Sequence, residues 1–151
     1  MIKYAASSLN SKNNMENKHS REIVHKGKIL AVVFSKNLPA DGVRFLTPTH
    51  YPLQIGLIQH KLGKNVPLHI HRDMRYKVNT TQEFLYVIKG QVEITIATKK
   101  WEVLEKFPLS QGDFILFVGG AHGVDIKKGA RLIEVKQGPY PGDDYAKRFK
   151  K

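Results

Sequence analysis

The chain has 151 residues, no cysteine and a formal charge of +12, from 25 Lys and Arg against 13 Asp and Glu. This length suits one domain with its own core, and the absence of cysteine excludes disulfides, thiolate metal ligands and a thiol nucleophile. No apolar run approaches the roughly 20 residues of a membrane-spanning helix, so we expect a cytoplasmic protein without a membrane partner. The lysines are spread along the chain rather than gathered in one block, so nucleic acid is not an expected partner.

Residues 1–20 are polar, and we expect them to form a flexible leader. After them, runs rich in Val, Ile, Phe and Tyr alternate with Gly, Pro and Asn, a pattern typical of short strands separated by turns. The predicted extended runs are 22–25, 28–34, 43–46, 53–61, 67–71, 83–88, 91–96, 101–104, 113–118 and 131–136. The first two are separated by a turn at Lys26-Gly27 and are predicted to form a hairpin. Residues 143–151 are predicted as a C-terminal tail or a last helical turn.

Two of these runs carry a clear side-chain pattern. Val92, Ile94 and Ile96 alternate with polar residues, which predicts a half-buried strand whose apolar face packs in the core. Glu134 and Lys136 also lie on one face of their strand, where a solvent-side ion pair is favoured over the wall of a pocket. So many short strands with little helix predict an all-β barrel or jelly roll in one domain. Open strand edges favour a homodimer.

Four residues of the central stretch suggest a metal site. His69 and His71 are one residue apart, so in an extended segment both imidazoles lie on one face. Glu83 begins the next strand, and His122 follows the strand 113–118 and a Gly-Gly turn. Three imidazoles and a carboxylate suit one divalent transition metal such as Fe, Zn, Ni or Mn. The alternative is a surface His-x-His pair without a ligand role.

The spacing of these residues resembles the two motifs of the cupin superfamily. Gly63, five residues, His69-Ile70-His71, then Glu83, six residues and Gly90 follow the first motif, except that eleven residues separate His71 from Glu83 where the family has three or four. The stretch from Gly112 to His122 follows the second motif loosely, with Val118 in place of Pro and Ile126 in place of Asn.

A narrower resemblance, carried by Thr81-Gln82-Glu83, 119–123 and 133–140, is to a group of small bacterial single-domain cupins. The resemblance implies a cupin β-barrel over residues 21–142 and a metal held by His69, His71, Glu83 and His122. It also suggests a carbohydrate-related role.

The insertion Arg72–Thr80 lies between the predicted ligands, so Arg72, Arg75 and Tyr76 are candidate substrate contacts, against the alternative of a solvated turn. The favoured function is a metal-dependent enzyme, an isomerase, epimerase or oxygenase, that acts on a small polar, sugar-like or acidic molecule. One alternative is a non-catalytic small-molecule binding or sensor protein. Another is a metal-free epimerase-like cupin with a His as general base, which is less favoured because all four ligand positions hold competent residues.

Overall fold

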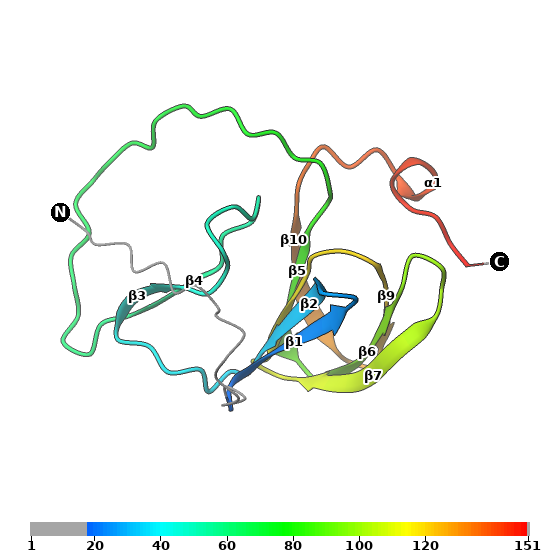
Figure 1. Cartoon of the computed structure of the whole chain (residues 1–151). Helices are drawn as coiled ribbons and strands as arrows, with labels where there is room; N and C mark the ends of the chain where they lie inside the picture. The colour runs from blue at the N-terminus through cyan, green and yellow to red at the C-terminus, as the bar shows by residue number, and fades with distance from the viewer. Residues whose placement is uncertain (1–17, 151) are drawn as a thin grey trace. The chain divides into compact units, whose positions relative to one another are not determined.

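The computed structural model describes residues 18–150, which form ten strands and one short helix (Figure 1). The strands are β1 (Ser20–His25), β2 (Lys28–Phe34), β3 (Gly42–Phe45), β4 (Gly56–Gln59), β5 (Glu83–Lys89), β6 (Gln91–Ala97), β7 (Val103–Ser110), β8 (Phe114–Phe117), β9 (Ala121–Ile126) and β10 (Arg131–Lys136); the helix is α1 (Asp143–Ala146). The predicted leader lies outside the described residues as far as residue 17, and Ser20 at its end already belongs to β1. The described chain forms two compact units, residues 18–38 with 80–150, and Pro39–Asn79.

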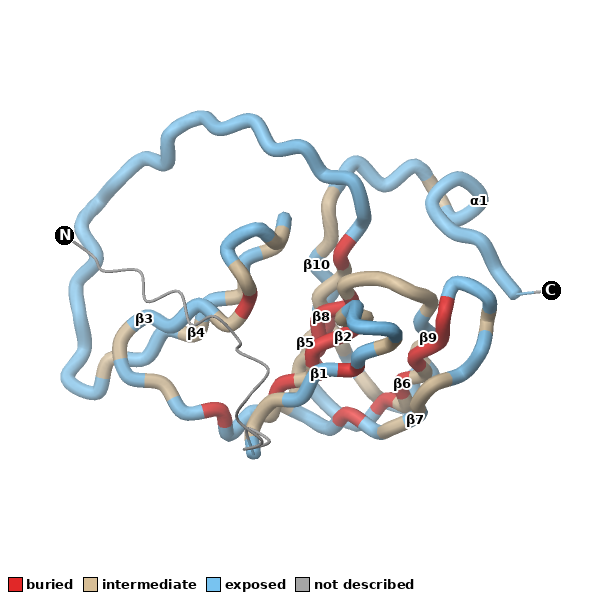
Figure 2. Tube along the Cα trace, viewed as in Figure 1, coloured by how far each residue is buried: buried red, intermediate tan, exposed pale blue. Residues whose placement is uncertain are grey.

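The larger unit consists of two antiparallel sheets. One has the strand order β1-β2-β8-β5-β10 and the other the order β7-β6-β9. Its core contains buried residues from both sheets (red in Figure 2): Ile23, Ala31, Leu85, Val87, Val92, Ile94, Ile96, Leu109, Ile115 and Phe117. The all-β prediction is therefore confirmed, while the closed cupin barrel and the single domain stay predictions.

The strands of this unit follow the side-chain alternation of the sequence. In β6, Val92, Ile94 and Ile96 are at most 1% exposed, whereas Glu93 and Thr95 between them are partly exposed. This confirms the predicted core face. The β1–β2 hairpin is also confirmed, and its turn needs a left-handed backbone at Lys26 and Gly27, with φ of 49° and 72°.

The smaller unit contains one strand pair, in which β3 runs antiparallel to β4. The predicted strand 53–61 is confirmed only over Gly56–Gln59. The predicted strand 67–71 is wrong: residues 61–82 contain neither helix nor strand, and residues 61–81 are all exposed (Figure 2). Leu68 and Ile70 are 104% and 95% exposed, so the alternate apolar side chains find no sheet to cover.

The structure adds elements that the sequence did not predict. Strand β9 contains His122 itself, whereas the sequence predicted only a Gly-Gly turn before His122 and no strand after it. Strand β7 continues through Pro108 to Ser110. Pro108 has no backbone N–H to donate to a neighbouring strand, and it is tolerated because β7 lies at the edge of its sheet. Residues 143–151, by contrast, were predicted as a tail or a last helical turn, and they begin with the short helix α1. Within residues 18–150 no helix is long and apolar enough to cross a membrane.

Candidate functional site

Glu83, the predicted carboxylate ligand, is the first residue of β5 and lies between two neighbouring strands. It is opposite Phe117 of β8 on one side and Lys136 of β10 on the other. The preceding residue, Gln82, is buried, and its N–H donates to Oε1 of Gln137 at 2.8 Å. This hydrogen bond fixes the start of β5, and with it the backbone that carries the carboxylate.

His122, the predicted ligand of the second motif, is brought to Glu83 from the other sheet. It is the second residue of β9 and pairs with Ile96 of β6. Its ring stacks on Phe117, with centroids 3.9 Å apart and planes within 7°, and Phe117 is only 2% exposed. The stack holds the imidazole so that Nε2 lies 3.6 Å from Oε1 of Glu83.

The separation of these two donor atoms suits a shared metal ion. Two donors bound at about 2.0–2.1 Å in tetrahedral geometry lie roughly 3.4 Å apart. The 3.6 Å between His122 Nε2 and Glu83 Oε1 is close to that value. It is also longer than the usual hydrogen bond between such groups. The pair can therefore provide two ligands to one ion with little movement.

The charge of Glu83 is stabilised by its neighbours. Its side chain is only 15% exposed, and burial alone would raise its pKa. Interaction with the His122 imidazole outweighs this and, together with the ammonium groups of Lys136 and Lys147, lowers the pKa of Glu83 below its ordinary value of 4.5. Glu83 is thus an anion at neutral pH, the form that a metal ligand requires.

This lowered pKa predicts a pH-dependent stability. A carboxylate whose pKa is depressed in the folded state stabilises the fold above its unfolded pKa, and that contribution is lost as the pH falls through the folded pKa. We expect Glu83→Gln to lower the free energy of unfolding at pH 7 by about 1–2 kcal/mol. The difference between wild type and variant should stay constant down to the ordinary carboxyl pKa and shrink at lower pH. Urea denaturation in the presence of a chelator measures it.

The matched control is Glu22→Gln on β1, because Glu22 is exposed and has no ion pair among the described residues. It removes the same charge, so its effect should be within about 0.5 kcal/mol of zero at every pH. Equal effects of the two substitutions would contradict a specific role of the Glu83–His122 pair.

The first-motif histidines belong to the smaller unit, in the exposed segment without regular structure. Their rings nevertheless lie side by side, with centroids 5.0 Å apart, which confirms that His69 and His71 share one side of the chain. Nδ1 of His69 is 2.8 Å from the carbonyl oxygen of Pro67. In the tautomer that donates this bond, Nε2 carries the lone pair that a metal ligand needs.

The structure therefore brings the four predicted ligands together as two pairs, one in each compact unit. Within residues 18–150 no group of three or more His, Asp or Glu side chains is close enough to hold a metal ion. The predicted substrate contacts Arg72, Arg75 and Tyr76 are exposed, and Tyr76 is 74% exposed. Their role stays a prediction.

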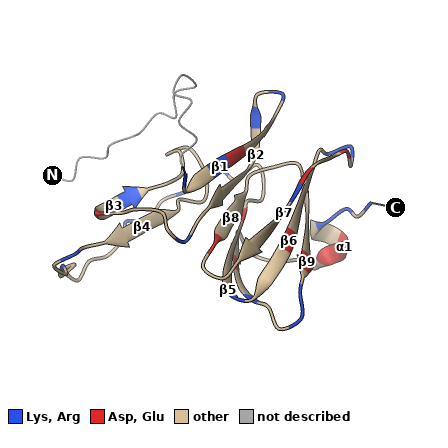
Figure 3. Cartoon of the chain, turned by 90° about the horizontal axis from the view of Figure 1, so that it is seen from below, with Lys and Arg blue, Asp and Glu red and all other residues tan. Residues whose placement is uncertain are grey.

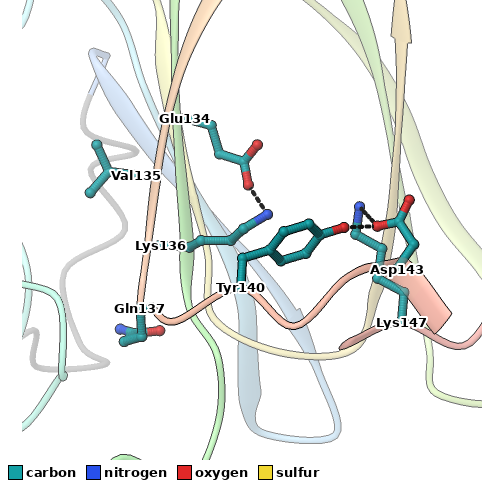
Figure 4. Close-up of a pocket in the computed structure, with 8 residues that line it drawn as sticks. Glu134, Val135, Lys136, Gln137, Tyr140, Asp143 and Lys147 are labelled. Atoms are coloured by element: carbon teal, nitrogen blue, oxygen red, sulfur yellow. Dashed lines mark hydrogen bonds and ion pairs between the residues drawn. The ribbon is translucent and has the colours of Figure 1, made fainter. Parts of the chain in front are cut away.

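A polar pocket that the sequence did not predict lies beside Glu83. It has a volume of about 610 Å³ and is lined by Glu134, Val135, Lys136, Gln137, Gly138, Tyr140, Asp143 and Lys147 (Figure 4). Lys136 Nζ forms an ion pair with Glu134, lies 4.0 Å from Oε2 of Glu83 and is 4.6 Å from the centre of the Tyr140 ring. Lys136 thus connects the pocket to the carboxylate.

The other side of this pocket is formed by Asp143 of α1 together with Tyr140 before the helix and Lys147 after it. The Tyr140 hydroxyl donates to Asp143, which raises the pKa of Tyr140, and Lys147 Nζ lies 2.9 Å from the same carboxylate. The sequence held only weak indications of this pocket. These were an Asp and a Lys four residues apart, and the placement of Glu134 and Lys136 on one face of their strand. The predicted Glu134–Lys136 ion pair is present, and it also forms the pocket wall that we had expected less.

The site as a whole offers a fixed carboxylate–imidazole pair beside a pocket of alternating charges and a phenol. Such a surface can hydrogen-bond a small polar molecule at several points, because ammonium and hydroxyl donors lie next to carboxylate acceptors. Comparison with protein-family models, with curated proteins and with solved structures gave no match for this chain.

Proposed function

We propose that this chain is a metal-binding cupin that acts on a small polar, sugar-like or acidic substrate. The ion would be one divalent transition metal, Fe, Zn, Ni or Mn, held by His69, His71, Glu83 and His122. The motif spacing supports the choice of these four residues. The cupin barrel, a homodimer and a cytoplasmic location are part of the same proposal.

The observation that carries the proposal is the geometry of Glu83 and His122. Residues 39 apart in the chain and in different sheets place Nε2 and Oε1 3.6 Å apart, with the imidazole stacked on a buried Phe117. Fixing two donors in this way costs side-chain entropy before any ligand arrives, which is typical of a preorganised site. The His69 and His71 rings, which lie 5.0 Å from each other, would provide the further pair of donors.

A metal bound here would act as a Lewis acid on a substrate oxygen or lower the pKa of a bound water. The residues of the chain supply the binding and orientation. Lys136 lines the pocket, and its Nζ lies 4.0 Å from Oε2 of Glu83. It would therefore disfavour coordination of the metal by Oε2, and it would attract an acidic group of the substrate. Tyr140, Glu134 and Asp143 would accept or donate hydrogen bonds to substrate hydroxyls. Arg72, Arg75 and Tyr76 are the proposed contacts from the exposed segment.

The same pair supports a second candidate, a metal-free epimerase-like enzyme. A carboxylate beside an imidazole stabilises the imidazolium, so His122 could accept a proton from a substrate carbon with Glu83 as its orienting partner. Both candidates use the same pocket, and they differ in their need for a metal ion.

Elemental analysis tests the proposal on protein that was purified without metal-affinity chromatography. We expect about one ion per chain in the wild type, and none in either His122→Ala or the double variant His69→Ala/His71→Ala. If both variants lose all metal, the two pairs serve the same ion. Far-UV circular dichroism and urea denaturation check that each variant is folded.

The matched control is His25→Ala/His50→Ala, which removes two imidazoles outside the motifs and should keep its metal. Full metal content in the His69→Ala/His71→Ala variant would overturn the assignment of these ligands. A wild type that stays metal-free after reconstitution with each of the four metals would favour the second candidate.

A further inference from the structure

The turn between β6 and β7 is a rigid loop that presents two lysines. The side chain of Thr98 is buried, and its Oγ1 accepts from the N–H groups of Lys100 and Glu102 at 3.2 and 3.3 Å. Trp101 N–H donates to the carbonyl of Thr98 at 2.9 Å, and Trp101 has a left-handed φ of 69°. The exposed Lys99 and Lys100 at its tip are therefore held on a fixed backbone.

The C-terminal tail packs against this loop. The guanidinium of Arg148 lies 5.6 Å from the centre of the Trp101 ring, and its Nη2 donates to the carbonyl of Lys99 at 3.3 Å. Loop and tail together line a second, open pocket of about 630 Å³. It is lined by Lys99, Lys100, Trp101, Glu102, Arg148, Phe149 and Lys150.

The charge of this second pocket is unbalanced. Four cationic side chains line it, against the single carboxylate of Glu102. Among residues 18–150 none of these four cations has an ion pair. In the pocket beside Glu83 both lysines are paired, Lys136 with Glu134 and Lys147 with Asp143. Figure 3 shows the Lys and Arg residues of the tail beyond α1 in blue.

We propose that the pocket formed by the β6–β7 turn and residues 148–150 binds a small soluble ligand with two or more adjacent phosphate groups. Gathering four unpaired cations costs repulsion energy, which a compact polyanion removes on binding. Lysine provides point charges for phosphate, and Arg provides a planar donor for a second phosphate oxygen. A neutral sugar would leave these charges unpaired. The proposal is independent of the metal site.

Trp101 makes the test specific, because it is the only tryptophan of the chain and lines the pocket. Inorganic pyrophosphate absorbs no light near 280 nm, so it can be titrated while the Trp101 emission is recorded. We expect a saturable emission change in the wild type. The double variant Lys99→Gln/Lys100→Gln should bind at least about tenfold more weakly, because two of the four attracting charges are gone. Equilibrium dialysis with labelled pyrophosphate measures the same affinities without the tryptophan signal.

The matched control is Lys127→Gln/Lys128→Gln, which removes the same charge at another turn of the same unit, where Lys127 is paired with Asp125. It should bind pyrophosphate within about twofold of the wild type. Equal loss in both double variants would mean that only net charge matters and would overturn the proposal. Absence of saturable binding by dialysis would overturn it as well. The proposal would also be overturned if the protein sedimented with phosphatidylserine vesicles but did not bind free pyrophosphate, because the ligand would then be a lipid surface.

Discussion

Ile94→Ala is expected to lower the free energy of unfolding of the larger unit by about 3–4 kcal/mol. Ile94 is fully buried in the middle of β6, the central strand of its sheet, and belongs to the core cluster that includes residues of both sheets. The substitution removes three carbons from a close-packed site and leaves a cavity. Because β6 is hydrogen-bonded to a strand on each side, its backbone cannot easily move to close that cavity. Urea denaturation monitored by far-UV circular dichroism measures the change.

Ile126→Ala provides the comparison, because Ile126 lies at the end of β9 in the same sheet and is 59% exposed. The same atoms are removed, but most of them already contact water, so the expected cost is below about 1 kcal/mol. If the two variants were equally stable, the side chain of Ile94 would not be part of the core, which would contradict this prediction.

The sequence predicted the sheet elements of the larger unit well wherever side-chain alternation coincided with a clear turn. The apolar face of 91–96 was predicted because Val92, Ile94 and Ile96 alternate with polar residues, and their burial follows from that alternation. Residues 22–34 were predicted as a hairpin because Lys26-Gly27 separates two β-rich runs. In both cases the local pattern already contains the information that the fold uses.

Elements that depend on distant partners were predicted less well. The run 67–71 alternates like a strand, but alternation states only which side chains share a face, and a strand also needs a neighbour to pair with. Leu68 and Ile70 are instead exposed. Conversely, Ala121 and Gly123 have low strand propensity, and β9 forms because β6 offers it a partner from Val92 to Ala97.

The candidate site shows the same limit. The motif spacing named Glu83 and His122, and the structure places their side chains next to each other. The spacing could not reveal that Phe117 would stack on His122 or that Lys136 would lie opposite Glu83, because both contacts depend on strand register and sheet packing. The pocket formed by β10 and α1 depends in the same way on how the chain turns after Lys136. Whether the His69 and His71 pair serves the same ion stays a prediction.

Gly120→Ala is expected to lower the free energy of unfolding by about 3 kcal/mol and to reduce metal binding at the proposed site. Gly120 joins β8 to β9 with φ of +74°, where an alanine costs about 1–2 kcal/mol. An added Cβ would also lie 2.7 Å from the carbonyl oxygen of Ala97 and 3.2 Å from a methyl group of Leu30. Ala97 is paired with Ala121, so relieving this contact would move the backbone that carries His122.

Gly129→Ala separates the two causes, because Gly129 has nearly the same φ of +77° but no atom within 4 Å of an added Cβ. This substitution should lower the free energy of unfolding only by the cost of the left-handed backbone, about 1–2 kcal/mol. The variant should keep its full metal content. Denaturation and elemental analysis of the two variants measure both effects. A similar cost for the two would show that the close approach of Gly120 to Ala97 does not constrain the turn. Equal metal content in two folded variants would mean that the position of β9 does not determine binding at His122.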